Sequence, residues 1–125
     1  MKTRIAPARL TAYGVVGVRA AVAAGFALRP RPTMTRVYGT TDPGLRPVAW
    51  GIAARDAALG YGLLRALRQG RGAGRWMLAG TVADAFDLVT VVATIPKRKT
   101  GNVPAVAGMC AIVAIDSVLS RRLDR

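Results

Sequence analysis

The sequence predicts an all-α fold in which four transmembrane helices form an antiparallel bundle, integral to a membrane. Three observations predict it: four apolar runs follow one another, basic residues gather between the runs, and the third run (residues 76–95) buries Asp84 and Asp87 in apolar sequence. About twenty apolar residues, at a rise of about 1.5 Å each, span the roughly 30 Å hydrocarbon core of a bilayer. We therefore expect one membrane domain over residues 1–125.

The first run covers residues 10–28 and follows a segment containing Lys2, Arg4 and Arg9. A basic segment before an apolar run is typical of a secretory signal, and the Ala-rich run contains triplets that would allow cleavage. The run is, however, longer than the apolar core of a typical signal, and the same pattern recurs three times downstream. We expect an uncleaved first span.

The connector over residues 29–47 is rich in Pro, Thr and Arg. Proline removes a backbone donor and interrupts a helix interior, so we expect an irregular segment here and no continuous helix. We expect this segment to pack on the membrane surface, with Met34 and Tyr38 dipped into it.

The second run covers residues 48–67 and carries Arg55 and Asp56 near its middle. Residues 68–75 form a short turn rich in Gly and Arg, so the second and third spans should be antiparallel neighbours. The third run stops at a proline followed by three basic residues, and the fourth covers residues 103–120.

The basic residues between the spans predict the orientation of the chain. With four spans both termini lie on one side, together with ten basic residues: Lys2, Arg4, Arg9, Arg65, Arg68, Arg71, Arg75, Arg121, Arg122 and Arg125. The other side has seven: Arg29, Arg31, Arg36, Arg46, Lys97, Arg98 and Lys99. Because cytoplasmic loops carry more Lys and Arg, we expect cytoplasmic termini in a multi-pass protein of the cell membrane.

A soluble, nucleic-acid-binding bundle is the alternative that the net charge of +13 raises. Such a protein would carry its basic residues along a helix face, whereas here they lie between the apolar runs. The third run also has the reverse of a soluble pattern. Its polar residues form one narrow stripe, which should face inward: Thr81, Asp84, Asp87, Thr90 and Thr94. We therefore expect anionic lipid head groups as partners and no nucleic acid.

Charged residues within the spans should form an intramembrane polar network: Arg19, Arg55, Asp56, Asp84, Asp87 and Asp116. Five of them lie near a span midpoint, where each unpaired charge costs roughly 2.5–3.5 kcal/mol, on the order of 15 kcal/mol together. The simplest pairing joins Arg55 to Asp84 or Asp87 and leaves Arg19 another carboxylate. Asp116, nearer the end of its span, could bond Ser120 or reach an interfacial Arg.

Three interpretations of this network are open. It could only set the register of four Ala- and Gly-rich helices, or it could line a small polar cavity for a proton, an ion or a head group. It could also hold a metal through Asp84-x-x-Asp87, as in CDP-alcohol phosphotransferases. We reject this last match because Trp50 stands where that motif needs an Asp, and we expect no metal.

Residue types absent from the chain exclude several chemistries. There is no His and no Glu, and Cys110 is the single cysteine. An internal disulfide, a histidine-ligated haem and a Ser-His or Cys-His nucleophile pair are therefore ruled out. We expect no catalytic residues and no cofactor.

Short motifs in the first three spans resemble one family. Arg19 followed by Gly25-Phe26-Ala27-Leu28-Arg29-Pro30, then Arg55-Asp56-Ala57-Ala58-Leu59-Gly60 and the Asp-bearing third span, is similar to the small four-helix bacterial membrane proteins grouped as domain of unknown function 4267. The resemblance covers nearly the whole chain. It implies a four-helix integral membrane fold and no activity. Members often carry a His in the last span, which this sequence lacks.

These observations favour a non-enzymatic structural or accessory membrane protein, self-associating as a homodimer or bound in a larger membrane complex. The alternative is a small proton- or ion-coupled carrier or channel that acts as a dimer through the buried aspartates.

Overall fold

The computed structural model describes residues 7–94 and 103–123, and all regular structure in these ranges is helical. The elements are α1 (Pro7–Leu28), α2 (Pro30–Tyr38), a 3₁₀ turn η1 (Pro43–Leu45), α3 (Arg46–Gln69), α4 (Ala73–Thr94) and α5 (Val103–Leu123).

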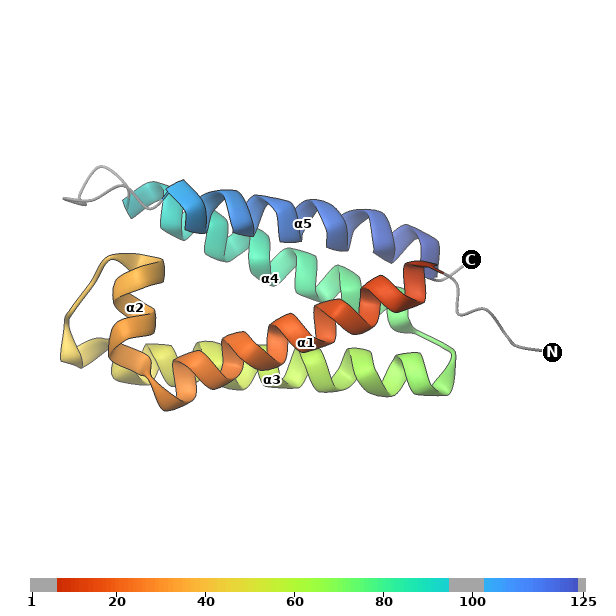
Figure 1. The fold of residues 1–125 in the computed structure, drawn as a ribbon, viewed down its shortest axis with the longest axis horizontal. Coiled ribbons are helices and arrows are strands. Elements are labelled where there is room, and N and C mark those ends of the chain that lie inside the picture. Colours follow the sequence, from red (N-terminus) through yellow and green to blue (C-terminus); the bar gives the residue numbers. More distant parts are fainter. Residues whose placement is uncertain (1–6, 95–102, 124–125) are drawn as a thin grey trace.

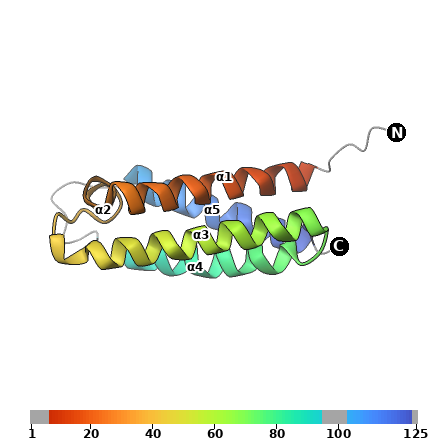
Figure 2. The ribbon, with the colours of Figure 1, turned by 90° about the horizontal axis from the view of Figure 1, so that it is seen from below.

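Four long helices form two contacting pairs (Figures 1 and 2). Helix α1 packs along α3, and α4 packs along α5. The start of α1 and the end of α5 lie at the same end of the molecule, beside the turn between α3 and α4. The short helix α2 lies across the opposite end, transverse to the long helices.

Helix α2 shows that the prediction of an irregular connector is wrong for residues 30–38. The prolines stand at the helix start, with Pro30 as its first residue and Pro32 in its first turn. Amide groups there have no partner within the helix, so the missing N–H of proline costs little. Gly39 ends the helix in the left-handed region, at φ 66°, and its N–H donates to the Thr35 carbonyl.

Met34 of α2 is buried, and the rings of Phe26 and Tyr38 pack at 6.3 Å between centroids. The expectation that Met34 and Tyr38 dip into the membrane surface is therefore wrong for Met34, which packs inside the protein, and the Tyr38 ring packs against the same cluster.

The turn between α3 and α4 is built by glycine. Gly70 and Gly72 have φ values of 69° and 74°, which L side chains rarely adopt. Gly70 closes α3, and its N–H is directed at the Ala66 and Leu67 carbonyls. The Arg9 guanidinium of α1 also donates to the Leu67 carbonyl, at 2.6 Å. A cation at the C-terminal end of α3 complements the helix dipole and fixes the start of α1 against this turn.

The interior consists of two apolar clusters with charged residues between them. The cluster near the α3–α4 turn contains Ala12, Leu63, Ala66, Leu67, Ala73, Met77 and Leu119. The cluster near α2 contains Phe26, Met34, Ala49 and Ala53. Along α1 the order is Ala12, Arg19, Phe26, so the buried arginine stands midway between the clusters, on the same helix face.

Two helices within the described part of the chain are long and apolar enough to cross a membrane. They are Pro7–Leu28 and Ala73–Ala93, each with a mean hydropathy of 1.5. Helix α3 carries Arg55, Asp56 and Arg65 within its apolar stretch, which lowers its hydropathy.

Candidate functional site: the Arg19 network

Arg19 is the centre of the polar interior and bonds an aspartate from each of the other three long helices. Its Nη1 donates to Asp56 Oδ1 of α3 at 2.7 Å. Its Nη2 donates to Asp84 Oδ2 of α4 at 2.7 Å and to Asp116 Oδ2 of α5 at 3.0 Å. The Arg19 side chain is only 6% exposed. A planar guanidinium suits this role, because its fork presents two separate terminal nitrogens to carboxylates on different helices.

Two glycines make room for this arginine. A β-carbon at Gly60 of α3 would lie 3.3 Å from Arg19 Cβ, and one at Gly80 of α4 would overlap the Arg19 Nη2 atom. The Arg19 side chain therefore passes close to both helix backbones, with its Cβ at Gly60 and its guanidinium at Gly80. The sequence-based search for charged residues missed both glycines. The sequence signal that could have found them is their spacing: Gly60 lies four residues after Asp56, and Gly80 lies four residues before Asp84.

Arg55 forms the second, more open half of the network. Its two terminal nitrogens hold both oxygens of Asp87, at 2.9 and 2.6 Å, and Nη2 also donates to Asp56 Oδ2 at 3.0 Å. Asp56 thereby bridges the two arginines, one through each oxygen. The Arg55 side chain is 31% exposed, so this half lies nearer the surface than Arg19.

The structure brings all six candidate residues into one connected network. Of the two aspartates considered as partners of Arg55, the structure pairs it with Asp87. Asp116 does not bond Ser120, whose hydroxyl donates to the Ser117 carbonyl instead. It reaches Arg19 because helix α5 turns this carboxylate, which is 0% exposed, toward the centre.

The polar stripe of the third span is only partly inward. Asp84, Asp87 and Thr81 are partly buried, but Thr90 is exposed and its hydroxyl donates to the Phe86 carbonyl one turn earlier. A threonine in a helix can bond its own backbone in this way, so it needs no polar neighbour. The Thr94 side chain lies outside the described residues.

Acidic groups outnumber basic groups in the network. Four aspartates and two arginines carry a formal charge of −2 when all are ionised. In addition, Asp116 Oδ1 is buried without a hydrogen-bond partner. Burying an uncompensated carboxylate is costly, and Asp116 is the aspartate of the network that keeps an oxygen unpaired. Within the described part of the chain, no group of three or more candidate ligands could hold a metal ion.

Comparisons with protein-family models, with curated proteins and with solved structures found no match for this chain. The resemblance to domain of unknown function 4267 therefore stays a prediction.

Proposed function

We propose that this chain is an integral membrane protein with four antiparallel spans, and that it acts as a non-enzymatic structural or accessory subunit. The observation that carries the proposal is the Arg19 junction, in which one side chain bonds an aspartate from each of three other helices. Such a junction fixes the register of helices that have few large interlocking side chains.

The distribution of apolar side chains supports a lipid environment. Only 22% and 17% of the apolar windows in α1 and α4 are buried, unlike the core helix of a soluble protein. The large exposed side chains include Leu28 at 81%, Phe86 at 76% and Val89 at 69%. Charged groups inside and bulky apolar groups outside match the requirements of a bilayer.

We place both termini in the cytoplasm, on the ten-to-seven excess of basic residues at that end. The partners that fit are anionic lipids together with a second copy or a larger membrane complex.

A second function, a small proton-coupled carrier, is favoured by the excess of carboxylates around Arg19. A carrier of this kind needs a carboxyl group that gains and loses a proton, and Asp116 has an oxygen without a partner.

Alkaline carbonate extraction tests the membrane assignment. Membranes from cells that express the protein are washed in carbonate at high pH and sedimented. A membrane-spanning protein stays in the pellet. Release into the supernatant would overturn the assignment.

The variant Asp84→Asn separates the two functions. In the structural case folded protein decreases, because Arg19 loses the negative charge of Asp84 and one of its two acceptor oxygens. In the carrier case the amount of folded protein is unchanged and proton flux into vesicles is lost. Asp42→Asn is the matched control, since Asp42 is exposed and lies outside the network.

Mild-detergent affinity purification then tests the accessory role. Co-purification of a larger assembly supports this role. A dimer that carries protons into vesicles would assign the carrier function instead.

A further inference from the structure

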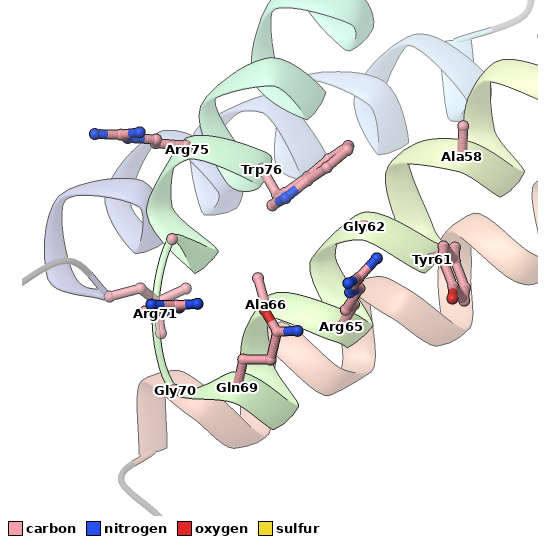
Figure 3. Close-up of a pocket in the computed structure, with 12 residues that line it drawn as sticks. Ala58, Tyr61, Gly62, Arg65, Ala66, Gln69, Gly70, Arg71, Arg75 and Trp76 are labelled. Atoms are coloured by element: carbon pink, nitrogen blue, oxygen red, sulfur yellow. The ribbon is translucent and has the colours of Figure 1, made fainter.

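An open cleft lies between the end of α3 and the start of α4, at the end of the molecule that holds the start of α1 (Figure 3). Its volume is about 1170 Å³. Its lining comes from the last turns of α3, the turn itself, the first turn of α4 and Leu123 of α5. Three arginines contribute to it: Arg65, Arg71 and Arg75.

The positive charge of this cleft is not balanced by its described neighbours. All three arginines are exposed, and none of the described ion pairs involves them. The described lining residues include no aspartate. The four aspartates of the long helices all bond Arg19 or Arg55, and Asp42 caps the 3₁₀ turn η1 that follows α2. Among the described residues, the guanidinium groups of the cleft therefore have no acidic partner.

Aromatic side chains form one wall of the cleft. A β-carbon at Gly62 would overlap the Trp76 ring, so the glycine lets the indole sit directly against α3. Trp76 remains 40% exposed, and Tyr61 is 66% exposed. Figure 3 shows the Trp76 indole facing the α3 wall that carries Arg65, whereas Arg75 projects away from the indole. Trp and Tyr at the end of a span mark the boundary between head groups and acyl chains.

We propose that this cleft binds the phosphate group of an anionic phospholipid in the leaflet on the side of the termini. The inference rests on the membrane location proposed above. Arg65 and Arg71 would donate to the phosphate oxygens, since a guanidinium matches a phosphate with two parallel hydrogen bonds. The positive end of the α4 dipole adds to the attraction.

A lipid fits this site better than a soluble phosphate. Leu78 and Val82, which are 55% and 61% exposed, lie on the face of α4 that carries Arg75, and Arg75 also lines the cleft. An acyl chain can lie on this surface while its phosphate stays at the arginines. A soluble anion would make no contact with this apolar surface.

Native mass spectrometry of the full chain in mild detergent tests the proposal. Phosphatidylglycerol and phosphatidylcholine are added in separate titrations. We expect the wild type to bind phosphatidylglycerol at least about tenfold more tightly, and we expect Arg65→Ala with Arg71→Ala to remove this preference. Arg65→Lys with Arg71→Lys should restore only part of it, because an ammonium cannot bond a phosphate through a planar fork.

The control is Arg68→Ala with Arg122→Ala, which removes the same charge from exposed positions that do not line the cleft. An equal loss of phosphatidylglycerol in this control would overturn a specific site. Displacement of the lipid by inorganic phosphate at millimolar concentration would assign the cleft to a soluble anion and overturn the lipid assignment. Size-exclusion profiles of all variants should match the wild type.

Failure of this proposal is distinct from failure of the membrane assignment. If the protein resists carbonate extraction but the cleft variant keeps the preference for phosphatidylglycerol, only the lipid site is refuted. Release by carbonate would refute both the membrane assignment and the lipid site.

Discussion

Two charged regions of this molecule have opposite compositions. The Arg19 network holds four aspartates against two arginines, whereas the cleft beside the α3–α4 turn holds three arginines and, among its described lining residues, no acid. Network members bond one another in the interior, and the arginines of the cleft point to the surface.

The difference concerns where the hydrogen bonds of a guanidinium are satisfied. Arg19 has its terminal donors directed at carboxylates, so removing it leaves buried charge without compensation. An exposed arginine contributes little to folding, because water already solvates it. The network should therefore determine stability, and the cleft should determine what binds. Four changes test this division.

Arg19→Ala should have the largest effect. Asp56, Asp84 and Asp116 would keep no shared cation, and breaking a buried ion pair costs about 3–5 kcal/mol. That is a large part of a typical net stability of about 5–15 kcal/mol. We expect little monodisperse protein in size-exclusion chromatography. Arg68→Ala, at an exposed position of α3, should behave as wild type; equal yields for the two variants would contradict the central role of Arg19.

Gly80→Ala should rank second. The added methyl group would displace the Arg19 guanidinium, and overpacking of this kind costs up to about 3 kcal/mol. Thermal unfolding monitored by circular dichroism measures the loss. The control is Gly17→Ala in α1, where a β-carbon meets no atom within 4 Å. This control should be neutral or slightly stabilising, by up to about 1 kcal/mol. A stable Gly80→Ala protein would show that Arg19 has another route to its partners.

Arg55→Ala should cost about 1–2 kcal/mol, less than Arg19→Ala. Asp56 would keep its bond to Arg19, and Asp87, with 18% of its side chain exposed, retains some solvation. Thermal unfolding of the two arginine variants in the same detergent gives the order directly. If Arg55→Ala were the more damaging change, Arg55 and not Arg19 would be the centre of the network.

Asp116→Asn should have the smallest effect, below about 1 kcal/mol. The amide oxygen can still accept from Arg19, and the change lowers the excess of carboxylates. Infrared difference spectra of this variant can show whether a protonated carboxyl band of the wild type is lost. A destabilisation as large as that of Arg19→Ala would mean that Asp116 is needed as an anion.

The sequence predicted most of the network but little of its geometry. Mid-span charges such as Arg19 and Asp84 had to meet, because apolar surroundings offer them no other partner. Which carboxylate each arginine holds depends on helix rotation, and rotation is set by close approaches such as that of Gly80 to Arg19. The helix at Pro30–Tyr38 was missed because prolines interrupt a helix interior but suit its first turn. The cleft was missed because Arg65 and Arg71 were expected only to set orientation; it forms where α4 folds back and places the Trp76 ring against Gly62 of α3.

The bonds of Arg19 also impose an order on biosynthesis. Arg19 leaves the ribosome first, and its partners follow at separations of 37, 65 and 97 residues. The last of them, Asp116, is made only after α1, α3 and α4. Nascent chains that stop before α5 carry the arginine without its full set of acids. Quality-control proteases should therefore recognise truncated products, and C-terminal deletions should reduce abundance more than their length alone implies.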